Sequence, residues 1–195
     1  MVYLLRKTTK GGRAKGRGRL SDKTARTTAA LAEQTMKEEK TNAMRLLDGK
    51  KIPYTVYNYC ESGAVSGTDA ADALSLPYEK VFKTLVTTGK SGTHYVFDIP
   101  ADRELDLKKA AAAVGEKNVA MLKSKDLLPL TGYVHGGCSP VGMKKFFLTV
   151  FDVSVLGQEK IVFSAGKIGF FAEVAVKDLE KILKYSVADV TAERR

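Results

Sequence analysis

The 195-residue sequence has only two cysteines, Cys60 and Cys138, and no long apolar run. Two cysteines cannot form a disulfide framework, which excludes the small secreted domains that depend on one. No apolar run reaches the ~18 residues that a membrane-spanning helix needs, so we expect no membrane as a partner. Because the basic start of the chain also lacks the apolar core of a secretory signal, we expect a cytoplasmic protein, with an Arg-rich organellar transit peptide as the alternative.

Metal-binding and nucleotide-binding patterns are also missing. The two histidines and two cysteines, at positions 60, 94, 135 and 138, lack the paired close spacings of a structural zinc site. Ser164-Ala165-Gly166-Lys167 is followed by Ile168, whereas a P-loop requires Ser or Thr after its Gly-Lys. We therefore expect no metal and no cofactor, and we reject a nucleotide triphosphatase.

Basic residues are concentrated at the start of the chain. The formal net charge is +10, and residues 1–26 alone hold nine Lys/Arg and one acidic residue. Residues 1–40 have too little apolar content to order themselves, so we expect a flexible basic extension there and one folded domain over residues 41–195. A disordered extension with no role in RNA binding is the alternative. Our candidate contacts to RNA phosphates are Arg13, Lys15, Arg17 and Arg19.

Hydrophobic periodicity and turn residues predict helices and short strands in alternation. Helices are expected near residues 41–49, 66–74, 107–114 and 176–185. Strands are expected near residues 54–59, 83–88, 93–99, 119–122, 146–151, 160–164 and 170–174, the second and third joined as a hairpin through Gly89-Lys90-Ser91-Gly92. This succession predicts a mixed α/β (α+β) domain, with a curled mixed sheet around a pocket and helices around the sheet.

Lys83 interrupts the apolar, β-branched run Val81-Phe82-Lys83-Thr84-Leu85-Val86. A strand lysine that points into a pocket is a fixed cation for a phosphate, a carboxylate or an ester carbonyl. The plainer interpretation is a solvated charge at a sheet edge, because long charged side chains reach water from half-buried positions. The residue alone favours the plainer interpretation.

Two adjacent glycines, Gly136 and Gly137, precede Cys138-Ser139-Pro140. Paired glycines let backbone N–H groups approach a ligand that any Cβ would hold away, although a tight turn is the commoner use of such a pair. His135 and Cys138 have the residue types of a cysteine hydrolase. We expect Cys138 instead to be an inert apolar residue, since that is the usual state of an unpaired cysteine.

Four carboxylates surround Pro100, and we assign them no mechanism. Helix capping and solvent exposure explain them at least as well as acid–base chemistry. They are Asp98, Asp102, Glu104 and Asp106.

Three motifs in this order, Phe82-Lys83-Thr84-Leu85, then Gly-Gly-x-Ser-Pro at 136–140, then Ser164-Ala165-Gly166-Lys167, resemble the YbaK family of aminoacyl-tRNA deacylases. The resemblance covers about residues 41–190. It implies a YbaK-like domain that hydrolyses a mischarged amino acid, chiefly cysteine, from tRNA, as trans editing of Cys-tRNA(Pro). The implied partners are the aminoacylated 3′ end of tRNA and, as a second candidate, prolyl-tRNA synthetase.

The resemblance also assigns roles to residues. It implies catalytic roles for Lys83, Gly136, Gly137 and Ser164, and substrate-binding roles for Tyr59, Thr84 and Lys167. The lysine would hold the 3′ end while the thiol of the substrate attacks its own ester carbonyl, so no protein nucleophile is required. An adjacent thiol is a preoriented nucleophile, and the lysine with glycine N–H groups would stabilise the developing oxyanion.

Two departures from the family pattern leave the amino acid open. Many members have Gly-Gly-Lys-Arg-Gly where this chain has the run from Ala165 to Gly169, and Phe170-Phe171 stands where a more polar pair can occur. The alternatives are an alanine-specific deacylase of the same fold, a non-catalytic tRNA- or synthetase-binding module, and a ligand-binding regulatory domain.

Overall fold

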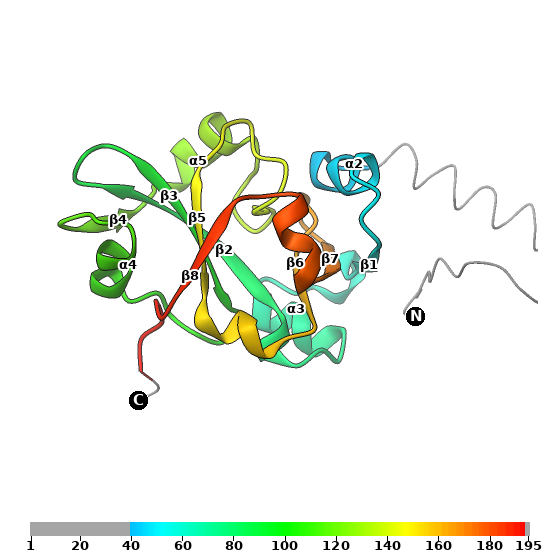
Figure 1. The fold of residues 1–195 in the computed structure, drawn as a ribbon. Coiled ribbons are helices and arrows are strands. Elements are labelled where there is room, and N and C mark those ends of the chain that lie inside the picture. The colour runs from blue at the N-terminus through cyan, green and yellow to red at the C-terminus, as the bar shows by residue number, and fades with distance from the viewer. Residues whose placement is uncertain (1–39, 194–195) are drawn as a thin grey trace, which may run out of the picture.

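The computed structural model describes residues 40–193 (Figure 1). The predicted basic extension, apart from its last residue, lies outside this range, as do its four candidate RNA contacts Arg13, Lys15, Arg17 and Arg19. Within the described range, no helix has the length and apolar character needed to span a bilayer.

Three of the described α-helices begin at a residue whose side chain caps the helix. Thr41 Oγ1 accepts a hydrogen bond from the Met44 N–H at 3.2 Å, and Ser66 forms the predicted capping box with Asp69. Asp106 caps the third helix, which bears out the capping role expected of it. The α-helices of the described residues are α2 (Asn42–Gly49), α3 (Gly67–Ala73), α4 (Leu107–Ala113) and α5 (Ser124–Thr131), and the last of these is not among the helices predicted from the sequence.

The described strands form two sheets, confirming the mixed α/β prediction. One has the order β1-β7-β6 and the other the order β4-β2-β3-β5-β8. The first is antiparallel, whereas the second joins antiparallel β4-β2-β3 to parallel β5 and β8. The strands are β1 (Tyr54–Asn58), β2 (Phe82–Gly89), β3 (His94–Pro100), β4 (Val119–Met121), β5 (Leu148–Asp152), β6 (Lys160–Ser164), β7 (Phe170–Ala175) and β8 (Tyr185–Ala188).

The two sheets meet where β2 lies beside β6, near the centre of Figure 1. A single parallel bridge, Val81 to Val162, links them. Phe82, Phe151 and Phe163 are buried together in the largest apolar cluster, which fills the angle between the sheets. Large aromatic side chains of this kind contribute most to core stability, so the seam between β2 and β6 is a rigid base for the residues that follow it.

The helix predicted for residues 176–185 is wrong. The segment forms a short 3₁₀ helix, η4 (Val176–Lys181), and then the edge strand β8, which pairs in parallel with β5. Leu179 is fully buried, so the segment does have an apolar inner side, but the pairing of residues 185–188 with β5 ends the helix early. The other 3₁₀ helices are η1 (Cys60–Ser62), η2 (Tyr78–Lys80) and η3 (Val153–Gly157).

Candidate functional site

The strand registers place two predicted site residues, Lys83 and Ser164, in one row with Tyr57 and Phe171. Tyr57 lies opposite Phe171, and Phe171 lies opposite Ser164. Lys83 and Ser164 each stand two residues beyond the Val81–Val162 bridge, so their side chains leave the same face of their strands. We call this face, which bears Tyr57, Phe171, Ser164 and Lys83, the outer face. Sequence motifs that are 80 residues apart are thus neighbours in the fold.

Lys83 is neither deeply buried nor free in solvent. Its side chain is 27% exposed, and Nζ lies 3.2 Å from Oε1 of Glu104, whose own side chain is 84% exposed. An ion pair with such an exposed partner contributes little stability, because water screens it. An incoming anion or ester oxygen can therefore replace Glu104 at small cost. Glu104 is a surface carboxylate, as expected, but the sequence did not indicate that it would pair with Lys83.

The row continues into a small aromatic and hydroxyl lining. Ser164 is buried, and its Oγ accepts a hydrogen bond from the Gly166 N–H at 3.3 Å. The Tyr59 ring lies 4.7 Å from the Phe171 ring, and the Tyr59 N–H donates to the Gly169 carbonyl at 2.8 Å. Burial raises the pKa of the Tyr59 hydroxyl, which therefore stays protonated and can donate to a ligand.

The glycine pair packs against the turn that follows Ser164. A Cβ added to Gly137 would lie 3.1 Å from the Ile168 backbone nitrogen, so this position requires glycine for close approach. The Gly137 N–H donates to the Val134 carbonyl at 3.0 Å and is thus used inside its own loop. Gly136 is exposed and has φ of 80°, a left-handed conformation that favours glycine. Of the two, Gly136 is therefore the one available to a ligand.

Thr84 leaves the opposite face of β2 from Lys83 and binds a buried carboxyl. Its Oγ1 donates to Oδ1 of Asp98 at 2.7 Å. Asp98 is fully buried, Oδ2 has no hydrogen-bond partner within the described range, and burial raises the pKa of Asp98 to about 8. The expectation that capping or exposure explains Asp98 is wrong. Its position inside the apolar strand from His94 to Pro100 was the signal that could have shown this.

The remaining sequence candidates are separated from one another. Cys138 is buried beside Val86 and Val96, as expected of an inert apolar residue, and burial raises the pKa of its thiol to about 12. His135 is exposed, so the two do not form a nucleophile and base. Lys167 is exposed, and its Nζ lies 5.1 Å from the centre of the Phe170 ring, at the rim of the site.

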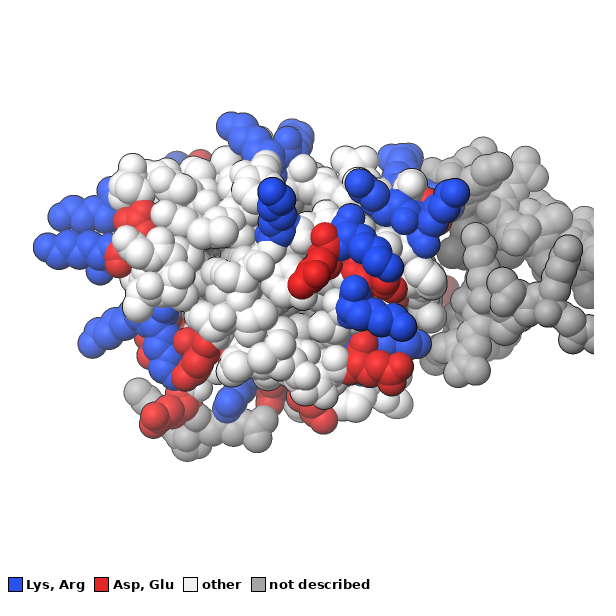
Figure 2. Space-filling model, in the orientation of Figure 1, with Lys and Arg blue, Asp and Glu red and all other residues white. Residues whose placement is uncertain are grey.

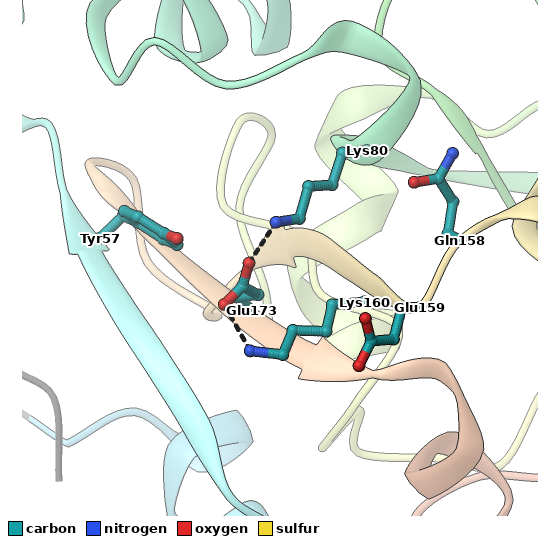
Figure 3. Close-up of a pocket in the computed structure, with 6 residues that line it drawn as sticks. All are labelled: Tyr57, Lys80, Gln158, Glu159, Lys160 and Glu173. Atoms are coloured by element: carbon teal, nitrogen blue, oxygen red, sulfur yellow. Dashed lines mark ion pairs between the residues drawn. The ribbon is translucent and has the colours of Figure 1, made fainter. Parts of the chain in front are cut away.

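A pocket of about 470 Å³ adjoins the row through Tyr57, and Figure 3 shows Lys80 and Lys160 directed at Glu173 inside it. Its base is Glu173, two residues beyond Phe171, which is buried and lies 2.5 Å from Lys80 Nζ and 3.5 Å from Lys160 Nζ. Burial alone would raise the pKa of Glu173, but the two lysines lower it below its ordinary value. The sequence did not lead us to predict this pocket. The acidic Glu173 within the otherwise apolar strand β7 is the feature that could have indicated it. Tyr57, Gln158 and Glu159 complete the lining.

No group of three or more acidic, histidine or cysteine side chains among residues 40–193 could hold a metal ion. The row and its lining offer the ammonium group of Lys83, hydroxyl groups, an exposed glycine nearby and aromatic rings. This set can bind an ester or a phosphate and stabilise a developing negative charge. It does not contain an activated protein nucleophile, because the serine lacks a neighbouring base among the residues of the row.

Comparison with known proteins identifies the family. The aminoacyl-tRNA editing domain matches residues 61–182. A protein of Enterococcus faecalis, named as a candidate Cys-tRNA(Pro)/Cys-tRNA(Cys) deacylase EbsC, is 41% identical over 155 residues, which cover 79% of this chain and 94% of the relative. A proline–tRNA ligase of Fervidobacterium nodosum is 34% identical over 76 residues, 39% of this chain but only 13% of that enzyme.

A solved structure shows the same fold. The crystal structure of a candidate trans-editing enzyme for prolyl tRNA synthetase superposes with a TM-score of 0.69 and 24% sequence identity, covering 78% of this chain and 96% of that one. The domain match, the 41% identical relative and this fold agree with the motif order in the sequence. The chain therefore belongs to the aminoacyl-tRNA editing domain family, the YbaK-type aminoacyl-tRNA deacylases.

Proposed function

We propose that the protein is a trans-editing hydrolase that removes cysteine from mischarged Cys-tRNA(Pro) in the cytoplasm. The observation that carries this proposal is the row on the outer face, where Lys83 and Ser164, from two different sheets, each follow the Val81–Val162 bridge by two residues. The name of the 41% identical relative supports cysteine as the amino acid. The catalytic residues are Lys83, Gly136 and Ser164, with Tyr59 and Lys167 in substrate binding. Gly137 and Thr84, for which the resemblance implied a catalytic and a substrate-binding role, are positioning residues instead, because the Gly137 N–H is used inside its own loop and Thr84 donates to buried Asp98.

The reaction uses the thiol of the substrate. Its sulfur attacks the ester carbonyl carbon of the same cysteine, the C–S bond forms, and the ester C–O bond to the tRNA 3′ end breaks. The thiol proton passes to the leaving ribose oxygen, and water then opens the cyclic thioester to release cysteine. Lys83 and the exposed Gly136 N–H stabilise the oxygen that becomes negative, and Tyr59 donates a hydrogen bond. Gly137 and Thr84 support the site without contacting the substrate. Gly137 packs against the Ile168 backbone, and Thr84 donates a hydrogen bond to buried Asp98.

The burial of Cys138 supports the use of the substrate thiol as the nucleophile. A thiol whose pKa is raised to about 12 holds almost no thiolate at neutral pH, so it does not compete with the substrate thiol. Phe171 beside Ser164 makes the lining apolar, which suits a thiol better than a hydroxyl.

The experiment compares ester loss from Cys-tRNA(Pro), Ala-tRNA(Pro), Ser-tRNA(Pro) and Pro-tRNA(Pro). We expect cysteine to be released faster than the other three, because only its side chain supplies the nucleophile. The Lys83→Ala variant should lose most activity, Lys83→Arg should not restore it, and Cys138→Ala should be nearly silent. Equal rates for the cysteinyl and seryl esters would disprove thiol assistance, and preference for alanine would support the alanine-specific alternative.

We also propose that the protein works beside prolyl-tRNA synthetase. The support is the 76-residue similarity to part of a proline–tRNA ligase, in which the matching segment and the synthetase share one chain. Co-sedimentation of the protein with prolyl-tRNA synthetase, with and without tRNA, tests this. If no association is detected under either condition, the protein acts on released aminoacyl-tRNA.

A further inference from the structure

One end of the molecule carries an exposed phenylalanine among unpaired lysines. We call it the lysine–phenylalanine surface, and it comprises Lys123, Lys125, Lys144, Lys145 and Phe146. The first two residues belong to the start of α5 and the others to the segment before β5. In Figure 2, Lys and Arg side chains rise from the upper edge of the view, where Figure 1 places α5, while blue and red are mixed over other parts of this face.

The charge of this surface exceeds that of its surroundings. Residues 40–193 hold 20 Lys/Arg and 18 Asp/Glu, so the described domain is close to neutral. Between residues 119 and 147 there are four lysines and one acid, Asp126. Among the described ion pairs, none involves these four lysines, whereas Lys80, Lys83, Lys109 and Lys160 all have carboxylate partners. The surface therefore has cationic charge that no described carboxylate neutralises.

Phe146 presents its ring to solvent. Its exposed fraction is 73%, whereas the adjacent Phe147 is 9% exposed and packs edge-on against His94 at 6.5 Å between ring centres. The two rings point in opposite directions because successive side chains alternate between faces in the extended residues before β5. An aromatic ring held outward beside Lys144 and Lys145 is the pairing of groups that binds unpaired nucleotides, where the ring stacks on a base and the lysines contact phosphates.

The surface is connected to the site through the glycine loop. The Lys144 N–H donates to the Thr131 carbonyl at 2.9 Å, and a Cβ on Gly132 would lie 3.1 Å from the Lys144 side chain. Gly132 begins the loop whose Gly137 packs on Ile168, a few residues past Ser164. A chain of contacts thus leads from the row on the outer face, across the two loops, to Phe146.

We propose that the lysine–phenylalanine surface binds the unpaired 3′ segment of an RNA acceptor end, with Phe146 stacked on one base and Lys144 and Lys145 on the flanking phosphates. This proposal rests on the proposed function, because it places the nucleotides that precede the ester held at Lys83. The surface sets affinity and register for the RNA, and the outer face performs the chemistry.

The test uses uncharged RNA, so that it does not depend on the reaction. Fluorescence anisotropy measures the affinity of the full chain for an RNA hairpin with a short unpaired 3′ end and for the same hairpin with a blunt end. We expect Phe146→Ala to weaken binding to the first hairpin on the order of tenfold, the loss of one base–aromatic stack, and to leave binding to the blunt hairpin nearly unchanged. Because no phosphate contact is lost, the dependence of log K on log salt keeps its slope.

The lysines predict the opposite pattern. Lys144→Gln with Lys145→Gln should weaken binding to the 3′-extended hairpin and reduce the salt slope by about 1.4, about 0.7 for each phosphate of a single strand. The controls are Leu156→Ala, which removes another exposed apolar side chain, and Lys177→Gln with Lys184→Gln, which removes two exposed lysines elsewhere. Both controls should bind as the unchanged protein does.

The outcomes separate this proposal from the proposed function. If Phe146→Ala binds both hairpins as tightly as the unchanged protein, the stacking role is wrong, and a parallel loss of prolyl-tRNA synthetase binding would assign the surface to a protein partner. If the predicted RNA pattern is seen but no aminoacyl-tRNA is deacylated, the surface stands and the proposed function fails. With Cys-tRNA(Pro), Phe146→Ala should raise KM on the order of tenfold and leave kcat within about twofold.

Discussion

Asp98 is the residue whose environment differs most from what its type leads one to expect. A fully buried carboxyl with one hydrogen bond, from Thr84, is stable mainly in its protonated form. It stands in the pair of strands that carries Lys83, with Cys138 of the glycine loop near it. With Asp98 protonated, the interior next to the glycine loop, which carries Gly136 of the proposed site, is uncharged.

The raised pKa of Asp98 makes stability depend on pH in a predictable direction. Below about pH 4 the carboxyl is protonated in both the folded and unfolded states, and its burial adds no ionisation cost. As pH rises toward about 8, Asp98 ionises in the unfolded state while it keeps its proton in the folded state. The free energy of unfolding therefore falls by up to about 1.4 kcal/mol per pH unit in this range. Above about pH 8, Asp98 is ionised in both states and causes no further fall.

The Asp98→Asn variant isolates this effect. Asparagine keeps an oxygen for the Thr84 hydroxyl but has no proton to lose, so its stability relative to the unchanged protein should increase between pH 5 and pH 8. Denaturant unfolding at several pH values measures the difference, and all other titrating groups are common to both proteins. Parallel stability curves across that range would mean that Asp98 is already ionised in the folded state.

At the scale of elements, the contact between the glycine loop and the turn after β6 joins two parts of the proposed site. Gly137→Ala would place a Cβ 3.1 Å from the backbone of Ile168, which cannot move as a flexible side-chain end would. We expect the loops to separate slightly, with a stability loss of about 1–3 kcal/mol and a fall in kcat/KM on the order of tenfold.

Gly157→Ala is the matched control, because a Cβ there would meet nothing within 4 Å and the residue lies in the 3₁₀ helix η3. Thermal unfolding and deacylation rates are measured for both variants. If Gly137→Ala retained full activity while losing stability, the loop contact would serve folding alone.

Local signals predicted most of the elements, and long-range pairing decided the exceptions. The caps at Thr41, Ser66 and Asp106 act within a few residues, so the sequence shows them directly. Strand β8 forms because it pairs with the edge of β5, which lies more than thirty residues earlier. The local sequence of residues 176–185 does not indicate this pairing. The resemblance implied catalytic roles for both Lys83 and Ser164, whereas the partners of Lys83 and Thr84, Glu104 and Asp98, depend on which segment covers each face of β2.

At the scale of the whole molecule, RNA affinity has two predicted sources: the lysine–phenylalanine surface and the basic extension. The extension lies outside the described residues, and its role stays a prediction from charge. Deleting residues 1–26 should weaken tRNA affinity and reduce the salt slope by about 2–3 if it makes three or four phosphate contacts. The rate constant at saturating tRNA should not change, because the outer face is untouched.

A tRNA titration at several salt concentrations, with the full chain and the truncated chain, measures this. The folded domain provides an internal reference, since its own lysines remain in both proteins. Identical affinities and slopes would mean that residues 1–26 do not bind RNA.

The row on the outer face also limits how the chain can change in length. Successive side chains of a strand point to opposite faces, so adding one residue within β7 would move Phe171 and Glu173 to the other face of the sheet and bring Ala172 and Val174 onto the face that bears the row. The same insertion in the turn around Gly92, at the far end of β2 from Lys83, would leave the register of the row unchanged. Relatives of this protein should accordingly vary in length at the β2–β3 turn and keep a fixed number of residues between Ser164 and Phe171.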